Sequence, residues 1–136
     1  MENALTYIKY AAALIGGMIT AALGGWDKML QVLVLFVILD YIVGLIAAWH
    51  EKKLDSTVGF KGITRKILLF VPIAVAYALD QMLGHEILRS LAIFFYLANE
   101  GLSILENLSR VGVPFPDGLV AALEQLKQKG EGHADH

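Results

Sequence analysis

Four apolar stretches occupy most of the first 110 residues of the chain. They cover approximately residues 4–25, 29–49, 67–83 and 91–108. A helix that crosses the hydrocarbon core of a membrane needs about 20 mostly apolar residues, and about 17 to 25 is the usual range. The pattern therefore predicts an all-α integral membrane protein. Its transmembrane domain, residues 1–110, is expected to be a bundle of about four helices.

The first stretch gives the weakest signal, because it contains Lys9 and is rich in glycine and alanine. It could lie in the interface as an amphipathic helix, which would leave three spanning helices. It could also be a cleaved signal peptide with residues 20–22 as the cleavage region, although no positively charged segment precedes it. We favour a spanning helix in which the Lys9 side chain reaches toward the lipid headgroups.

The segment 50–66, between the second and third stretches, is predicted to be a basic loop. Its basic residues, set against Glu51 and Asp55, are Lys52, Lys53, Lys61, Arg65 and Lys66. Because positively charged loops stay on the cytoplasmic side of a membrane, we expect this loop in the cytoplasm. Four spanning helices would then place both termini in the cytoplasm. A first stretch that does not span would leave the amino terminus outside or at the membrane surface.

A proline break begins the carboxy-terminal segment, residues 111–136. Pro114 and Pro116 cannot lie inside a helix, and each pushes the residue before it into an extended conformation. Asp117 is a candidate N-cap for a short amphipathic helix that follows. Its apolar side carries Leu119, Val120, Leu123 and Leu126 at helical spacing. We expect this helix to rest on the membrane surface or on a partner, and the final GEGHADH to be disordered.

Composition supports the membrane assignment and excludes several function classes. The chain is 57% hydrophobic and 18% charged, whereas soluble domains are roughly half apolar and a quarter charged. The net charge of -2 gives no indication of nucleic-acid binding. Cysteine is absent, which excludes disulfides, zinc-thiolate sites and a cysteine nucleophile. No catalytic or nucleotide-binding motif occurs, and His133 and His136 form only a loose HxxH. We expect neither an enzyme nor a cofactor or metal site.

Three acidic residues fall inside the predicted spans: Asp40, Asp80 and Glu100. An ionised carboxylate at the centre of a spanning helix costs about 2.5–3.5 kcal/mol, so such residues face protein or water. Asp80 is near the end of its stretch, where it could either be solvated at the interface or lie inside the span as an intramembrane acid. Asp40 and Glu100 are deeper, where a low dielectric favours the neutral acid. We expect both to be protonated and to donate hydrogen bonds between helices.

The fourth stretch has a polar face. We define the polar stripe as Asn99, Glu100, Ser103, Glu106 and Asn107, which recur at helical spacing. The opposite side is apolar and includes Leu97 and Leu105. We expect the polar stripe to line a contact between subunits or a water-filled lumen. Its last two residues could instead lie at the cytoplasmic interface, which makes the first three the most informative.

Small residues recur every four positions in the first two stretches. In the first stretch, Gly17 belongs to one such series and Gly24 to a second series beside it, and in the second stretch Gly44 and Ala48 follow Asp40 at the same spacing. Small residues at this spacing let membrane helices approach one another closely. The pattern predicts close helix packing, either inside one chain or between copies of it.

Four blocks in order carry a resemblance to a known family. They are DYIVG at 40–44, LDSTVGFKGITRK at 54–66, NEGLSILEN at 99–107, and GVPFPDGL followed by LEQLK at 112–127. With these blocks, residues 33–127 resemble the bacteriophage holin family that includes the toxin-secretion and phage-lysis holins of Gram-positive bacteria. The resemblance implies a small protein of the bacterial inner membrane that associates with itself and with membrane lipids and makes the membrane permeable. It also implies a functional link to an endolysin or a secreted toxin.

Two other functions fit the residues. Acids inside membrane spans are typical of ion or proton pathways, so a small selective channel or transporter is an alternative. The sequence lacks the inverted repeats and paired broken helices of many transporters. A scaffold without a pore, whose carboxy-terminal helix recruits a partner, is the other alternative. A holin-like homo-oligomer, the function that the family resemblance implies, accounts best for the small size of the chain, its close-packing faces and its polar stripe.

Overall fold

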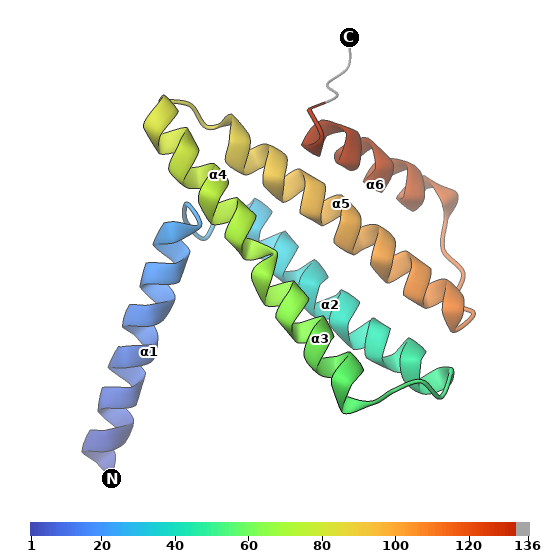
Figure 1. The fold of residues 1–136 in the computed structure, drawn as a ribbon, viewed down its shortest axis with the longest axis horizontal. Helices are drawn as coiled ribbons and strands as arrows, with labels where there is room; N and C mark the ends of the chain where they lie inside the picture. The colour runs from blue at the N-terminus through green and yellow to red at the C-terminus, as the bar shows by residue number, and fades with distance from the viewer. Residues whose placement is uncertain (133–136) are drawn as a thin grey trace.

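The computed structural model describes residues 1–132, which form six helices and no strand. The helices are α1 (Glu2–Ala22), α2 (Lys28–His50), α3 (Ser56–Leu68), α4 (Phe70–Leu83), α5 (Ile87–Arg110) and α6 (Asp117–Gly130). Four segments among these residues are long and apolar enough to cross a membrane: 2–22, 28–50, 56–83 and 87–110. The prediction of an all-α membrane protein with about four spanning helices is confirmed (Figure 1).

The segment 50–66 is not a loop, and this part of the prediction is wrong. Only residues 51–55 leave the helical conformation, and α3 then continues almost directly into α4. The Asp55 carboxylate begins α3 by accepting a hydrogen bond from the Val58 amide at 2.7 Å, which is an N-cap. The helix breaks at Leu69 because Pro72 has no amide hydrogen to offer the carbonyl four residues earlier. The third span is therefore a kinked helix of 28 residues.

Asp80 is buried, so of the two interpretations of this acid the structure shows the one inside the fold. Its side chain is only 2% exposed and accepts hydrogen bonds from the amides of Leu88 at 2.9 Å and Arg89 at 2.8 Å. These amides are in the first turn of α5, where helical N–H groups have no partner in their own helix. Asp80 of α4 therefore caps the start of α5 and fixes the turn that joins the two helices.

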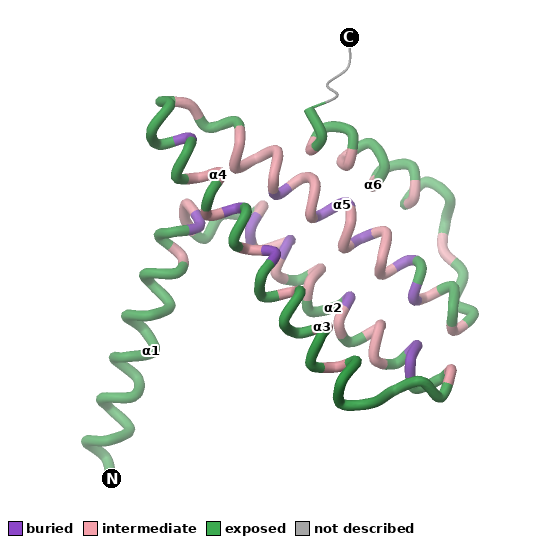
Figure 2. The backbone as a smooth tube through the Cα atoms, in the orientation of Figure 1, coloured by how far each residue is buried: buried purple, intermediate pink, exposed green. Residues whose placement is uncertain are grey.

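The helix α5 is at the centre of the bundle. It packs against α2 and α4 on one side and against α6 on the other (Figure 1). Buried positions recur along its length in Figure 2, in contrast with the exposed surface of α1. The hydrophobic core consists of Leu23, Leu30, Leu33, Leu69, Ile73, Ile93 and Leu97. The core thus joins the end of α1 to α2, the α3–α4 kink and the first half of α5.

The helix α1 projects away from the other helices (Figure 1). Its residues are exposed except for Thr20, which is half-buried. It joins the bundle through its carboxyl end, where Gly24 and Gly25 have φ angles of +91° and +107°. These left-handed conformations suit glycine because a side chain would be strained there. The sharp bend after α1 therefore depends on the two consecutive glycines.

The proline break leads to an amphipathic helix, as the sequence indicates, but its boundaries differ from those predicted. Pro116 is the N-cap position of α6, and Asp117 is its first helical residue. At the other end, Gly130, the first residue of the segment predicted to be disordered, belongs to the helix. His133 and His136 lie outside the described residues. Rather than projecting freely, α6 folds back along α5.

Candidate functional site

Three charged side chains from three helices meet inside the bundle. The Lys66 ammonium of α3 contacts the Asp40 carboxylate of α2 and lies 2.5 Å from Oε2 of Glu100 in α5. The exposed fractions of the side chains are 16% for Lys66, 5% for Asp40 and 13% for Glu100. One cation is thus shared by two acids that are 60 positions apart in sequence, near the middle of their helices.

The group extends toward one end of the bundle through Asn107. The Asn107 amide donates a hydrogen bond to Oδ1 of Asp40 at 3.0 Å, and its oxygen accepts one from Nη1 of Arg110 at 2.8 Å. Arg110 then makes a two-point contact with Glu51, at 2.9 and 2.7 Å. We call the six residues Glu100, Lys66, Asp40, Asn107, Arg110 and Glu51 the polar network. It runs from mid-span to the end of α2, and each of its three acidic side chains accepts a hydrogen bond from Lys66, Asn107 or Arg110.

Electrostatics explains why these groups tolerate burial. An isolated ion is costly inside a bundle, but opposite charges in hydrogen-bond contact offset much of that cost. Both Asp40 and Glu100 accept hydrogen bonds from Lys66, so each of these buried acids has a partner within the bundle. At the exposed end, the hydrogen bonds from Arg110 hold the pKa of the Glu51 carboxyl below its usual value. The polar network therefore joins α2, α3 and α5 through charge.

Glycines leave space for the side chains around this site. An ideal Cβ on Gly44 would lie 3.3 Å from Nδ2 of Asn107, so Gly44 keeps room for the amide that holds Asp40. A Cβ on Gly62 would lie 3.3 Å from the Tyr41 ring, whose hydroxyl donates to the Gly59 carbonyl at 3.3 Å. Ala48 is also buried. The small residues of α2 and α3 thus serve packing within one chain.

The predicted polar stripe does not behave as one unit. Glu100 and Asn107 turn toward α2 and α3 and join the polar network. Asn99 and Ser103 are half-buried, and Glu106 is exposed. The stripe therefore divides into an internal part, which holds helices together, and an external part, which remains available to water or a neighbouring chain.

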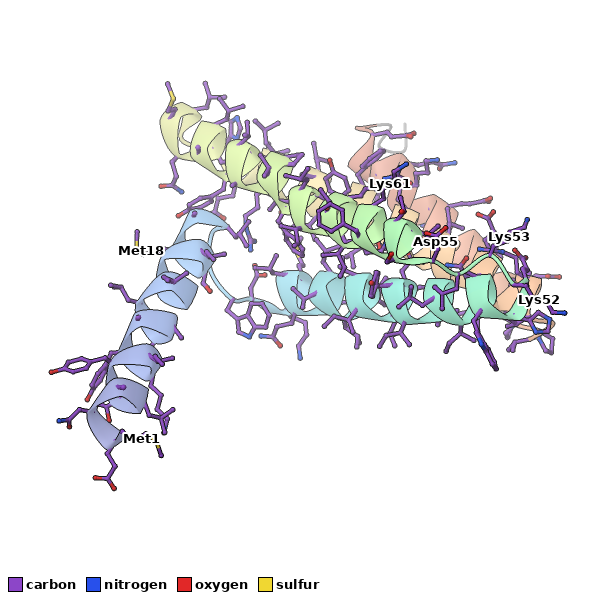
Figure 3. The ribbon with its side chains drawn as sticks, turned by 60° about the horizontal axis from the view of Figure 1, so that its bottom comes forward. Met1, Met18, Lys52, Lys53, Asp55 and Lys61 are labelled. Carbon is purple, nitrogen blue, oxygen red and sulfur yellow. The ribbon has the colours of Figure 1, made fainter. Side chains whose placement is uncertain are left out.

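The predicted basic residues also divide into two groups. Lys52, Lys53 and Lys61 are exposed near the connection between α2 and α3, as Figure 3 shows, and Arg65 is exposed as well. Lys66 alone turns inward. Sequence reasoning missed its role because it placed Lys66 in a loop. The signal was the capping residue Asp55, which predicts a helix that continues through Lys66.

A second polar group fixes the junction of α1, α2 and α5. The Arg89 guanidinium donates to the Leu23 carbonyl at 2.6 Å and contacts the Asp27 carboxylate at 2.6 Å. These hydrogen bonds hold the pKa of Asp27 below its usual value. Gly24 lies against Arg89, because an ideal Cβ there would be 2.5 Å from Nε. Gly17, in contrast, has open space beside it.

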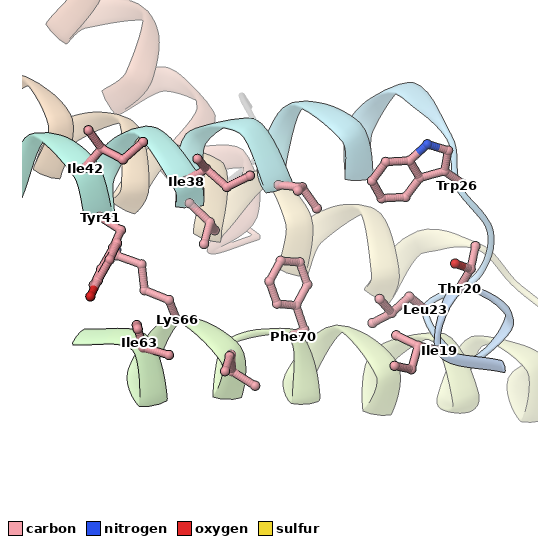
Figure 4. A pocket seen from close by; sticks show the side chains of 13 residues that line it. Ile19, Thr20, Leu23, Trp26, Ile38, Tyr41, Ile42, Ile63, Lys66 and Phe70 are labelled. Atoms are coloured by element: carbon pink, nitrogen blue, oxygen red, sulfur yellow. The ribbon is translucent and has the colours of Figure 1, made fainter. Parts of the chain in front are cut away.

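An apolar groove of about 510 Å³ lies between α2 and the α3–α4 helix. Figure 4 shows Ile38, Ile42, Ile63 and Phe70 along its walls, with Trp26 near the α1 end. The side chain of Lys66 also lines the groove before its ammonium reaches the acids. Such a surface suits lipid chains or another apolar helix, since its walls offer few polar partners.

Comparison with known proteins identifies relatives over most of the chain. An uncharacterized 14.9 kDa protein from the nagH 3' region of Clostridium perfringens is 44% identical over 131 residues, which are 95% of this chain and 99% of that protein. A protein named as a probable holin of Bacillus phage phi105 is 41% identical over 112 residues, covering 82% of this chain and 83% of the relative. No solved structure matches the chain. The profile described as the bacteriophage holin family matches residues 17–128. The chain therefore belongs to the bacteriophage holin family.

Proposed function

We propose that this protein self-associates in the bacterial inner membrane and permeabilises it in the manner of a holin. The observation that carries the proposal is the match of residues 17–128 to the bacteriophage holin family, in a chain with four segments long and apolar enough to cross a membrane. Polar residues within a span need protein or water around them. The half-buried Asn99 and Ser103 provide such polar surface on α5. This surface suits contact with another copy or with water.

The proposal includes an orientation and a cargo. The exposed basic residues near the α2–α3 connection favour the cytoplasmic side for that end of the bundle. With four spans, both termini are then cytoplasmic. A phage-type holin would give an endolysin access to the cell wall, whereas a related secretion protein would release a toxin. The relative named as a probable holin comes from a phage, which favours the endolysin link.

A leakage assay with variants of Glu100 tests the proposal. Wild-type protein and the variants Glu100→Gln and Glu100→Leu are expressed in a bacterial host at matched membrane levels. We expect the Glu100→Gln variant to retain most of the leakage, since glutamine can still accept a hydrogen bond from Lys66. The Glu100→Leu variant should lose most of the leakage. Val75→Leu, on the exposed surface of α4, is the control for a harmless change within a span. Full leakage from Glu100→Leu would refute a functional role for this polar group.

A selective ion or proton channel is the second candidate, because Asp40 and Glu100 place two carboxylates near one another around a lysine. Solutes of graded size distinguish the two functions. A holin-like lesion passes large dextrans or folded proteins, whereas a selective channel passes only small ions. Release of dextran from vesicles that contain the purified protein would exclude the channel. A sharp cut-off at small ions would exclude the lesion.

A further inference from the structure

The amphipathic helix α6 runs beside the middle of α5. Leu123 contacts α5 at Gly101, where an ideal Cβ would lie 2.6 Å from the leucine Cδ2. Gly130 lies against Phe95, since an ideal Cβ on Gly130 would be 2.4 Å from the Phe95 amide nitrogen. These two contacts fix the direction of α6. It starts after the carboxyl end of α5 and returns along α5, as Figure 2 also shows, and the Gly130 contact brings it to the level of Phe95.

This arrangement places the second half of α6 at membrane depth. The helix α5 covers residues 87–110, so its midpoint falls between residues 98 and 99. Its length is about 36 Å at 1.5 Å per residue, compared with a hydrocarbon core about 30 Å thick. Gln125 and Gln128 of α6 lie between the contacts at Gly101 and Phe95. They are therefore beside the centre of a spanning helix.

The outward surface of α6 is not suited to lipid. Its exposed residues include Glu124, Gln125, Gln128 and Lys129. The helix also ends at this depth, and Glu131 and Gly132 continue in a turn. The last carbonyl groups of a helix have no partner inside it. Backbone of this kind occurs at membrane depth only where protein buries it or where it lines a water-filled cavity.

We propose that α6 is a re-entrant helix whose outward face, formed by Glu124, Gln125, Gln128 and Lys129, borders water inside the membrane. The half-buried Val120, Leu123 and Leu126 hold α6 against α5, and the polar residues on its other side form one wall of an aqueous passage. The charged residues of the polar network are on a different side of α5, where they contact α2 and α3. The passage is thus lined by α6, while the polar network holds the bundle together.

The first experiment tests whether α6 occupies this position in a membrane. The chain contains no cysteine, so introduced thiols are unique. An ideal Cβ on Gly101 lies 3.3 Å from Cγ of Leu123, so a cysteine that replaces this leucine can place its sulfur within reach of a cysteine at 101. The full-length variant Gly101→Cys/Leu123→Cys is oxidised in vesicles, and linked peptides are identified by mass spectrometry. We expect a link within one chain. The control Gly101→Cys/Ala121→Cys, with Ala121 on the exposed side of α6, should not link.

The second experiment tests for water beside the linked helix. Gln125→Cys is introduced into the Gly101→Cys/Leu123→Cys protein, and a membrane-impermeant maleimide is applied to the oxidised protein in vesicles. A matched protein carries Val71→Cys in place of Gln125→Cys, at an exposed apolar position near the middle of the third span. We expect the thiol at position 125 to react about ten-fold faster than the thiol at position 71, because thiolates form in water and not in lipid. Failure of the 101–123 link, or equally slow labelling at 125 and 71, would overturn the proposal.

These measurements are separate from leakage. If the protein links and labels as expected but releases no dextran, the re-entrant helix is supported and the proposed permeabilising function is refuted. If the protein leaks but fails to link, the permeabilising function is supported and the re-entrant helix is refuted.

Discussion

The ammonium group of Lys66 contacts the carboxylate of Asp40, although the two residues are 26 positions apart. The contact ties α3 to the middle of α2, and the same ammonium reaches Glu100 of α5. Three helices therefore depend on one cation. This dependence makes Lys66 the residue whose removal should disturb the bundle most.

Replacement of Lys66 by methionine should destabilise the bundle by about 3–5 kcal/mol, because it leaves Asp40 and Glu100 buried without their cation. The loss would be measured as a lower midpoint of thermal or denaturant unfolding in mild detergent. Lys61→Met is the matched control, since Lys61 is exposed on the same helix. It should change stability by less than about 0.5 kcal/mol.

A neutral triple variant separates charge from shape at this site. In Lys66→Met/Asp40→Asn/Glu100→Gln, no buried charge is left without a partner at these three positions. We expect it to recover much of the stability that Lys66→Met loses, because replacing a whole ion pair is far less harmful than removing one member. If the triple variant is as unstable as the single one, the packing of the lysine stem matters more than its charge.

The Asp80 cap gives a local prediction. Asp80→Ala removes both acceptors for the amides of Leu88 and Arg89, so the first turn of α5 should open more often. Loss of a helix cap costs about 0.5–2 kcal/mol. Hydrogen exchange in detergent or nanodiscs should speed up at residues 88 and 89 before it changes in the middle of α5. Glu86→Ala, at an exposed neighbouring position, should leave these amides protected. Unchanged exchange in Asp80→Ala would contradict the capping role.

The contact between Arg89 and Asp27 predicts sensitivity to acid at the base of α1. Arg89 lowers the pKa of Asp27 from its usual value of 3.8. The contact therefore stabilises the folded junction fully above pH 3.8, and its contribution is lost as the pH falls through the lower pKa of the folded state. The fluorescence of Trp26, observed alone in a Trp49→Phe background, should change over this acidic range. The change should be absent in Asp27→Asn. The same transition in both proteins would assign it to another group.

The sequence was sufficient to predict the spans, because long apolar stretches report membrane helices almost directly. It also identified Asp40 and Glu100 as residues that need polar partners. It did not identify Lys66 as the partner of these acids, because Lys66 lies at the edge of a basic segment that was predicted to be a loop. Lys66 points into the bundle because it belongs to α3, the helix that Asp55 caps. The burial of Asp80 stayed open for a related reason. Besides the His85 ring, its partners are backbone amides of the next helix, and such amides have no signature in the side-chain pattern.

Two glycines in similar small-residue series should respond differently to alanine. An added Cβ at Gly44 would meet the Asn107 amide at 3.3 Å, so Gly44→Ala should displace Asn107 from Asp40 and lower the unfolding midpoint. Gly17 has open space beside it, and Gly17→Ala should stabilise α1 by up to about 1 kcal/mol through helix propensity. Both variants would be compared by unfolding and by native mass in mild detergent. If Gly17→Ala instead reduces the oligomeric mass while the fold remains intact, Gly17 packs against another copy of the chain. Equal effects of the two substitutions on unfolding would contradict the role of Gly44 in leaving room for the Asn107 amide.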